Sequence, residues 1–319
     1  MVERQTPPLG AYDVELRVKA CGVCRTDLHV VDGDLEEKQP HIVPGHEVVG
    51  IVERRGAHAK LAIGDRVGVP WLAHTCGECV YCRAGRENLC DAALFTGWSR
   101  DGGYAEMMVA DSRYCLPIPA QLSDADAAPL LCAGLIGYRC WRACGSPADV
   151  KTIGLYGFGA AAHILTQVAN AHGQQVYAFT RPGDYDAQKF ALSMGCVWTG
   201  GSDMPAPVKL DAAIIFAPVG ALVPAALAAV RKGATVVCGG IHMSPIPSFP
   251  YQLLWEERRL VSIANLTRSD GVEFLSMAER LGVRTHPRLY ALAQANEALD
   301  DLRAGAFTGA AVLTMSESA

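Results

Sequence analysis

The sequence lacks three features that would each indicate a particular class of partner or location. It has no excess of basic charge, because 28 Lys and Arg residues stand against 33 Asp and Glu residues, a formal net charge of -5 at pH 7. A polyanion such as nucleic acid is therefore not an expected partner. No apolar run reaches the ~20 residues that cross a bilayer, and the first residues, M-V-E-R-Q-T-P-P, lack the apolar core of a signal peptide. We expect a cytoplasmic protein that binds neither nucleic acid nor a membrane.

The chain is rich in apolar residues and in cysteine. Its 319 residues are 50% hydrophobic, which is enough to bury a large core and suggests about two domains. Twelve cysteines are many for a cytoplasmic chain, in which structural disulfides are uncommon, so we expect several of them to bind metal. The six that fall outside the motifs below are predicted to be small core hydrophobes: Cys21, Cys115, Cys140, Cys144, Cys196 and Cys238.

The least ambiguous motif consists of four cysteines in one polar loop. Cys76, Cys79, Cys82 and Cys90 follow the pattern C-x₂-C-x₂-C-x₇-C. Four thiolates from a single loop can close a tetrahedral zinc site with no open position, which is typical of a structural site. An iron-sulfur cluster is the alternative, but ferredoxin runs place the fourth cysteine before proline and at shorter spacing. Four cysteines that bind no metal would have to be buried in a hydrophobic core, and a polar loop offers none. Structural zinc is therefore favoured.

A second set of metal-binding residue types begins in the first fifty residues. Cys24 offers a thiolate and His46 an imidazole, both of which Zn²⁺ prefers. Apolar and polar residues alternate over 12–20, which predicts a half-buried strand leading into this stretch. Two ligands do not hold a catalytic zinc, so a third donor is needed. Cys132, at the start of a helical pattern over 130–143, is a candidate, although a lone cysteine at a helix start is more often simply buried.

The middle of the chain predicts a nucleotide-binding fold. Over 151–264, short apolar runs alternate with helical patterns, which indicates a parallel sheet wrapped by helices. The region opens with T-I-G-L-Y-G-F-G-A-A-A-H, read as a strand, a glycine turn and a helix. In this G-x-G-x-x-A variant of the dinucleotide motif, Gly157 permits the tight turn and Gly159 lets the backbone approach a pyrophosphate at the helix N-terminus. Phe158 and Ala162 complete the candidate cofactor-binding turn.

The strand predicted next, over 175–180, bears on the choice of cofactor. In NAD-binding folds an Asp or Glu at its end holds the adenosine ribose hydroxyls, but here it ends in Thr180 and Arg181. Thr180 does not repel a 2′-phosphate and Arg181 can pair with one, so the sequence leans toward NADP(H), with NAD(H) still open. An exposed loop arginine that binds no ligand is an equally good interpretation of Arg181.

The remaining patterns complete a two-domain α/β organisation. After residue 266 they predict two helices and a final strand that need a partner sheet, and we expect them to return to the first domain. The predicted catalytic domain is an irregular β domain over 1–131 and 266–319, and a doubly wound cofactor domain over 132–265 is inserted in it. Further strands are predicted over 212–216, 235–238, 260–264 and 310–313, and the two late helices over 271–281 and 293–304.

Together these residues resemble the zinc-dependent alcohol dehydrogenases of the medium-chain dehydrogenase/reductase superfamily. The resemblance covers nearly the whole chain and rests on C-G-V-C-R-T-D-L-H, P-G-H-E, the four-cysteine loop, the G-D-R-V turn and the glycine turn. It implies a GroES-like catalytic domain, a Rossmann cofactor domain, NAD(P) as cofactor and two zinc ions per chain. Cys24, His46 and Cys132 are the ligands that it implies for the catalytic zinc.

The resemblance also assigns roles near that zinc. Asp27 is expected to accept a hydrogen bond from the ring of His46, and Glu47 to lie beside the metal and approach it during ligand exchange. Arg25 is expected to contact the cofactor pyrophosphate.

Four more residues are implied to act on the substrate. Thr26 hydrogen-bonds the alcohol oxygen and passes a proton, through the nicotinamide ribose, to His29 at the surface. Trp71 and Trp98 fall where the family lines its substrate pocket, although a bulky aromatic residue in a domain core is a fair alternative for either.

The expected reaction is the interconversion of alcohols with aldehydes or ketones by hydride transfer. Two other functions are compatible with the same fold. A zinc-free quinone or enone reductase of the superfamily should lack Cys24, His46 and Cys132, and a noncatalytic or regulatory binding protein has no use for Thr26 and His29. Both sets are present, which favours the dehydrogenase. Its partners are expected to be a small alcohol or aldehyde and further copies of the chain, in a homodimer or homotetramer.

Overall fold

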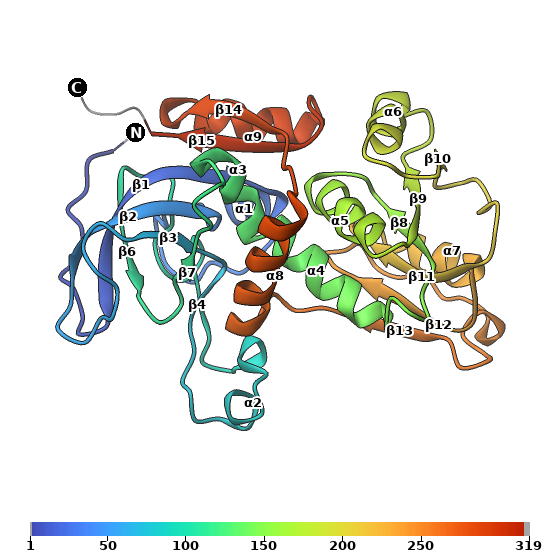
Figure 1. Ribbon diagram of the computed structural model, residues 1–319, viewed down its shortest axis with the longest axis horizontal. Helices are drawn as coiled ribbons and strands as arrows, with labels where there is room; N and C mark the ends of the chain where they lie inside the picture. Colours follow the sequence, from blue (N-terminus) through green and yellow to red (C-terminus); the bar gives the residue numbers. More distant parts are fainter. Residues whose placement is uncertain (1, 316–319) are drawn as a thin grey trace. The chain divides into compact units, whose positions relative to one another are not determined.

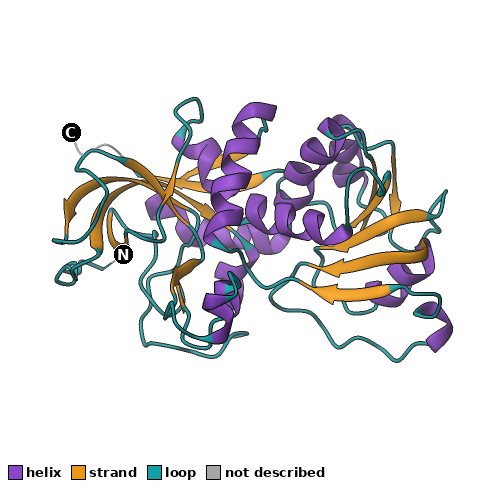
Figure 2. Cartoon of the chain, turned by 60° about the horizontal axis from the view of Figure 1, so that its bottom comes forward, coloured by secondary structure: helices purple, strands orange, loops and turns teal. Residues whose placement is uncertain are grey.

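The computed structural model describes residues 2–315 and divides the chain into two compact units. The first unit contains the residues up to Leu135 and those from Asn265 onward, and the second runs from Ile136 to Ala264 (Figures 1 and 2). Within the described residues, no helix has the length and apolar character that a membrane span requires.

The first unit is built on a sheet in which β1 has the central place. Residues Val14, Leu16 and Val18 are at most 1% exposed, whereas Arg17 points outward, so the predicted alternation is present. β1 pairs antiparallel with β2, β6 and β15, so a segment from the end of the chain lies beside one from its beginning (Figure 1). The strands are β14 (Pro287–Ala291), β15 (Ala310–Thr314), β1 (Asp13–Val23), β2 (Val48–Arg55), β3 (Arg66–Val69) and β7 (Leu116–Pro117) in sheet order, with β6 (Met107–Asp111) off this path.

Helices and a two-stranded sheet complete this unit. The longest of them, α8, starts with a capping box at Thr267 and ends at Gly282 in the left-handed region, two signals that the sequence carries openly. These elements are α1 (Arg25–Val31), β4 (Leu72–His74), α2 (Val80–Arg83), η1 (Glu87–Leu89), β5 (Leu94–Phe95), α3 (Asp124–Ala127), η2 (Ala128–Leu131), α8 (Arg268–Leu281), η4 (Leu292–Gln294) and α9 (Ala295–Ala304).

The second unit is a six-stranded parallel sheet with helices between its strands. Its strand order reverses between β8 and β11, the kind of position at which doubly wound sheets bind ligands. The strands in sheet order are β10 (Trp198–Gly201), β9 (Gln175–Thr180), β8 (Thr152–Tyr156), β11 (Leu210–Ile215), β12 (Val230–Cys238) and β13 (Arg259–Ser262), and the helices are α4 (Ala133–Cys144), α5 (Ala160–Ala171), α6 (Tyr185–Ser193), α7 (Leu222–Ala229) and η3 (Tyr251–Leu253).

The predicted α/β class is confirmed, and the local differences have physical causes. The helix predicted from residue 130 begins at Ala133, because a 3₁₀ turn with Pro129 in its first positions precedes it. Cys132 lies between the two helices with φ -133° and ψ -66°. The pattern also gave no sign of β14, whose mixture of exposed and buried residues lacks a period of two.

Candidate active site

Four side chains from three separate segments of the first unit converge on one point. Ligand atoms of Cys24, His46, Glu47 and Cys132 all lie within 4.8 Å of one another. The Sγ of Cys24 is 3.2 Å from the Nε2 of His46. The structure therefore brings together the three residues that the sequence singled out, and Glu47 with them.

The position of Cys24 follows from the way that α1 begins. Cys24 is the N-cap residue of this helix, and its Sγ accepts a hydrogen bond from the backbone N–H of Thr26 at 3.3 Å. The carboxylate of Asp27 reaches back to the backbone N–H of Cys24 at 2.9 Å, which completes a capping box. The same hydrogen bonds that start the helix thus orient the thiol.

Asp27 also fixes the second segment. Its Oδ1 accepts hydrogen bonds from the backbone N–H of Gly45 at 3.1 Å and from Nδ1 of His46 at 3.0 Å, and its side chain is 1% exposed. A carboxylate accepts from Nδ1, so Nδ1 carries a proton and Nε2 is the ring nitrogen that faces Cys24 and is left to bind a metal. This is the arrangement that a metal-binding histidine requires.

Glu47 is buried beside this pair with part of its carboxylate unsatisfied. It is 2% exposed, and within the described part of the chain its Oε1 has no hydrogen-bond partner. A Cβ on Gly22 would lie 1.8 Å from the Oε2 of Glu47, so glycine is required to leave room for it. Burial, and then the charge of Cys24, raise the pKa of Glu47 well above its usual value.

The electrostatics of the cluster fit a divalent cation. The hydrogen bond with Cys132 and burial raise the pKa of Cys24 well above the ordinary thiol value. Burial opposes the charged form of His46, but Asp27 and Cys24 outweigh it and raise the pKa of the imidazole. Metal ligands must be deprotonated, so a divalent cation bound here would take the place of the protons that these raised pKa values favour. Two thiols and an imidazole form a donor set that suits Zn²⁺.

Four cysteines form the second cluster, in the loop between β4 and β5. Their sulfur atoms lie within 4.8 Å of one another. Cys79 caps α2 and accepts from the backbone N–H of Cys82 at 3.5 Å, and the N–H of Cys79 points to Cys76 at 3.3 Å. Cys90 follows η1 and closes the set, with its sulfur 3.6 Å from that of Cys76. The set contains sulfur donors alone, which fits a closed zinc site.

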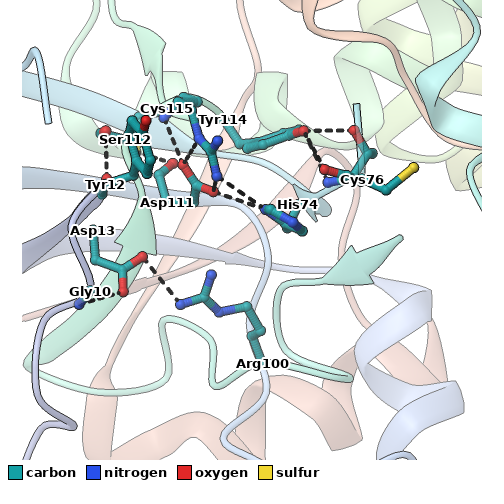
Figure 3. A network of polar contacts seen from close by, with 12 residues as sticks. Gly10, Tyr12, Asp13, His74, Cys76, Arg100, Asp111, Ser112, Tyr114 and Cys115 are labelled. Carbon is teal, nitrogen blue, oxygen red and sulfur yellow. Dashed lines mark hydrogen bonds and ion pairs between the residues drawn. The ribbon is translucent and has the colours of Figure 1, made fainter. Parts of the chain in front are cut away.

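A buried polar network holds the first end of this four-cysteine loop (Figure 3). The hydroxyl of Tyr114 lies 2.9 Å from the backbone N–H of Thr75, from which it accepts, and 2.7 Å from the Thr75 hydroxyl. One residue earlier, the Nδ1 of His74 contacts Asp111 at 3.0 Å, and Arg113 binds the same carboxylate. Because Thr75 directly precedes Cys76, the network fixes the backbone next to Cys76, the first cysteine of the loop.

The other end of the loop is held from α8. The carboxylate of Glu87 accepts hydrogen bonds from the backbone N–H of Arg268 at 3.1 Å and from its Nε at 3.2 Å. The guanidinium of Arg268 also lies 4.9 Å from the centre of the Tyr114 ring, a cation–π distance. Tyr114 therefore holds the first end of the loop, Arg268 holds the other end, and these two residues contact each other.

The predicted proton-transfer residues lie on α1. Thr26 is partly buried and Arg25 is exposed. His29 contacts the carboxylate of Asp34 through Nδ1 at 2.8 Å. Sequence reasoning missed Asp34, because it lies in an acidic loop whose charges looked like solvated surface.

An aromatic stack borders the first cluster. Trp71 is 6% exposed and meets the ring of His46 edge-on at 4.9 Å. It stacks on Phe95 at 5.3 Å and on Trp98 at 5.7 Å. The indole N–H of Trp98 donates to the backbone carbonyl of Glu36 at 2.9 Å, which ties the stack to the acidic loop. Both predicted tryptophans are therefore near the site, and Phe95, which the sequence did not single out, joins them.

The glycine turn of the second unit has the features of a phosphate-binding turn. Gly157 has φ +92°, and a Cβ there would lie 3.0 Å from the backbone nitrogen of Ala217. Gly159 is the N-cap of α5, and a Cβ on it would meet nothing within 4 Å, so the space beyond its backbone is open. Ala162 is fully buried against the sheet, while the ring of Phe158 borders Phe190.

At the end of β9, Thr180 and Arg181 differ in exposure. Thr180 is 3% exposed, and its hydroxyl donates to the carbonyl of Arg181 at 3.1 Å and accepts from Gln188 at 3.1 Å. The side chain of Arg181 is 78% exposed and contacts Asp184 at 3.5 Å. The guanidinium of Arg181 is therefore accessible to a ligand that approaches from solvent.

Comparison with known proteins decides the family. Residues 10–120 match the model of the alcohol dehydrogenase GroES-like domain. The chain is 44% identical over 319 residues to "Probable alcohol dehydrogenase AdhA" of Mycobacterium tuberculosis (strain CDC 1551 / Oshkosh), covering 98% of this chain and 91% of that protein. The chain belongs to the alcohol dehydrogenase family. An alcohol dehydrogenase of Geobacillus stearothermophilus is 33% identical over 98% of this chain and 94% of its own length.

Solved structures of alcohol dehydrogenases have the same fold. A cinnamyl alcohol dehydrogenase of Sorghum bicolor superposes with a TM-score of 0.88 at 26% identity, covering 98% of this chain and 92% of that one. The alcohol dehydrogenase of Aeropyrum pernix gives a TM-score of 0.87 at 25% identity, over 98% and 95%. The GroES-like and Rossmann fold is therefore confirmed, and so is the function as an alcohol dehydrogenase, an NAD(P)-dependent oxidoreductase.

The polar network at the start of the four-cysteine loop predicts that removing one of its groups makes this alcohol dehydrogenase measurably less stable. Tyr114→Phe leaves the N–H and hydroxyl of Thr75, a residue only 4% exposed, without their partner. We expect a loss of about 1–3 kcal/mol in the free energy of unfolding, measured by urea titration. Tyr185→Phe, at a residue that is 70% exposed, is the matched control and should change it by less than about 0.5 kcal/mol. Equal stability of the two variants would contradict this account.

Proposed function

We propose that this alcohol dehydrogenase is zinc-dependent and that Cys24, His46 and Cys132 hold its catalytic zinc. The convergence of these side chains within 4.8 Å, with Asp27 fixing the tautomer of His46, is the observation that carries the proposal. Three protein ligands leave a fourth position open for substrate. When bound, zinc supplies a Lewis acid that polarises the oxygen of the alcohol or carbonyl substrate. The first unit is then the catalytic domain and the second the cofactor domain.

Two acidic residues prepare this site. Asp27 keeps a proton on Nδ1 of His46 and so leaves Nε2 as the nitrogen that can bind a metal. Burial raises the pKa of Glu47, and its carboxylate lies close enough to the other three side chains that it could bind a zinc held by them while substrate and product exchange. The aromatic stack of Trp71, Phe95 and Trp98 excludes water on one side and offers an apolar wall to the carbon chain of a small alcohol or aldehyde.

Proton transfer is assigned to one face of α1. Thr26 holds the hydroxyl proton of the alcohol, and His29, one turn further on, passes it outward. Asp34 holds the ring of His29 through Nδ1 and, being 45% exposed, hands the proton to water. Asp34 extends the route that the sequence suggested.

The cofactor is assigned to the glycine turn of the second unit, which offers the N-terminus of α5 to a pyrophosphate. When bound there, NAD(P) would supply the hydride-transfer chemistry. Arg25 is assigned to the pyrophosphate, and Gly157, Phe158, Gly159 and Ala162 form the turn. NADP is preferred, because β9 ends in Thr180 without an acid and the exposed Arg181 is available to a 2′-phosphate.

The four-cysteine loop is assigned a second, structural zinc, because Cys76, Cys79, Cys82 and Cys90 offer four sulfur donors and no open position. The chain is assigned to a homodimer or homotetramer. The exposed edge of the parallel sheet at β13, which has a strand partner on one side, supports this assignment.

Substitutions of cysteine separate the two metal sites. Cys24→Ala should reduce alcohol-dependent NADP⁺ reduction below detection, while the free energy of unfolding falls by no more than the loss of one helix cap, about 1 kcal/mol. Cys79→Ala should instead lower the urea midpoint and the zinc content, because it opens the closed site. Cys196→Ala, which removes a buried thiol outside both clusters, is the control. It should keep the wild-type rate of NADP⁺ reduction and the wild-type zinc content. Wild-type rates in Cys24→Ala would show that the metal assignment is wrong.

The proton route predicts graded losses in turnover. His29→Asn should lower kcat by about 10²-fold, because general acid–base groups contribute at least that much. Asp34→Asn should lower kcat less and change its dependence on pH, while the KM for alcohol stays the same. His58→Asn, at an exposed histidine elsewhere in the same unit, is the control. Unchanged kcat in both His29→Asn and Asp34→Asn would rule out this route.

The assignment of Arg181 predicts a change in cofactor preference. Arg181→Ala should lower kcat/KM for NADP⁺ about 10-fold and leave the value for NAD⁺ unchanged, because the lost charge-assisted contact is made to the 2′-phosphate alone. Lys151→Ala removes an equal charge at the opposite end of the sheet and should change neither value. Equal losses with both cofactors would contradict the assignment.

A further inference from the structure

The second unit contains a cavity, open to solvent on one side, that the proposed mechanism does not use. Its volume is about 340 Å³, and all of its lining residues belong to this unit. They come mainly from α7 and from residues 202–209, which connect β10 to β11. Pockets that bind small organic molecules have volumes of roughly 300–1,000 Å³. The cavity is therefore large enough for a compact ligand.

The cavity exists because one crossover of the parallel sheet lacks a helix. Right-handed crossovers place α5 and α6 on one face of the sheet, and α7 and the β10–β11 connection on the other. Such a crossover usually has about a dozen residues or more and most often includes a helix. Here residues 202–209, S-D-M-P-A-P-V-K, form no helix (Figure 1). A segment of turns and irregular structure thus covers a face where a helix would normally pack.

Small and rigid apolar groups line the walls. On the side of α7 the cavity meets alanine methyl groups, which leave the space unfilled. On the other side two prolines restrict the backbone, so little conformational entropy is lost when a ligand binds. The apolar lining consists of Met204, Pro205, Ala206, Pro207, Val208, Ala225, Ala228 and Ala229.

Tyr156 provides a buried polar group in the cavity. Its side chain belongs to the last residue of β8 and is only 2% exposed, and its ring stacks on Phe179 with centroids 4.3 Å apart. Among the residues that the structure describes, none forms a hydrogen bond with its hydroxyl, and Tyr156 lines the cavity, so the hydroxyl is available to a ligand there. Burial raises the pKa of Tyr156, so the hydroxyl stays protonated and is available as a donor.

Lys209 adds a positive charge to the lining. Its Nζ donates to the carbonyl of Ala228 at 2.7 Å, which occupies one of the three N–H donors of an ammonium group. The described residues that line the cavity include no Asp or Glu. The chemistry of the lining is therefore mostly apolar, with the hydroxyl groups of Tyr156 and Ser202 and one cation, and it is suited to an apolar molecule with an anionic acceptor.

We propose that this cavity is a second ligand site, which binds a compact aromatic or alicyclic carboxylate. The ring of the ligand packs between α7 and the two prolines. One carboxylate oxygen accepts the hydrogen bond of Tyr156, and Lys209 supplies the compensating charge. The site involves neither zinc nor the glycine turn, so it stands independently of the function proposed above.

Isothermal titration calorimetry with 2-naphthoate tests this proposal on the full chain saturated with NADP⁺. The wild-type chain should bind one equivalent with a Kd below about 1 mM. Ala225→Phe fills the cavity from α7 and should weaken binding at least 10-fold. Ala221→Phe places the same ring on an exposed residue that does not line the cavity, and it should bind like the wild type. Cys24→Ala should also bind like the wild type, because the active site is not involved.

Two milder variants test the polar contacts without altering the walls. Tyr156→Phe should weaken binding about 5-fold and leave the thermal midpoint unchanged, because it removes one hydrogen bond to ligand and none within the protein. Lys209→Gln should weaken binding of 2-naphthoate more than binding of the neutral 2-naphthamide.

Three results would overturn the proposal. They are the absence of saturable binding to the wild-type chain, equal affinity of the wild type and Tyr156→Phe, and loss of binding in Cys24→Ala, which would place the probe in the active site. Tyr156→Phe decides the question if Ala225→Phe does not fold. Because no step of the assay requires turnover, its failure is distinguishable from failure of the proposed function.

Discussion

One buried carboxylate, that of Asp27, determines the geometry of the candidate active site. It accepts hydrogen bonds from the backbone N–H groups of Cys24 and Gly45 and from the ring of His46, so it joins the start of α1 to the loop before β2. Each of these contacts is charge-assisted and shielded from water, which makes it stronger than an exposed one. The thiol and the imidazole therefore meet because both segments are held by the same group.

In the function proposed here, the two cysteine clusters use the same ligand chemistry for different purposes. In the four-cysteine loop every donor is local, and contacts of Tyr114 and Arg268 hold its ends to the rest of the first unit. In the other cluster, Cys24, His46 and Cys132 come from distant segments, so the site forms only when the unit has folded. A closed local site stabilises a loop, whereas an open site built from distant segments is suited to exchange substrate.

The sequence was sufficient for features that depend on local spacing. The four cysteines, the alternation along β1 and the glycine turn at Gly157 each carry their structural reason in a short stretch, and all three were predicted. Asp34 and Phe95 were not, because their roles depend on contacts with His29 and Trp71 that no periodicity records. The cavity beside Tyr156 was also missed, since it results from a helix that the β10–β11 connection lacks. Cys132 became a candidate because Cys24 and His46 need a third donor, and the resemblance to a family, not its local pattern, assigned it as a ligand.

X-ray absorption at the zinc edge of the purified chain tests the central claim most directly. The account predicts two zinc environments, one with four sulfur ligands and one with two sulfurs and an imidazole, as the two clusters of donors require. The imidazole scattering should disappear in His46→Ala while the four-sulfur component remains. A spectrum that contains sulfur ligands alone, or imidazole scattering that persists in His46→Ala, would contradict the assignment of Cys24, His46 and Cys132 as the catalytic metal site.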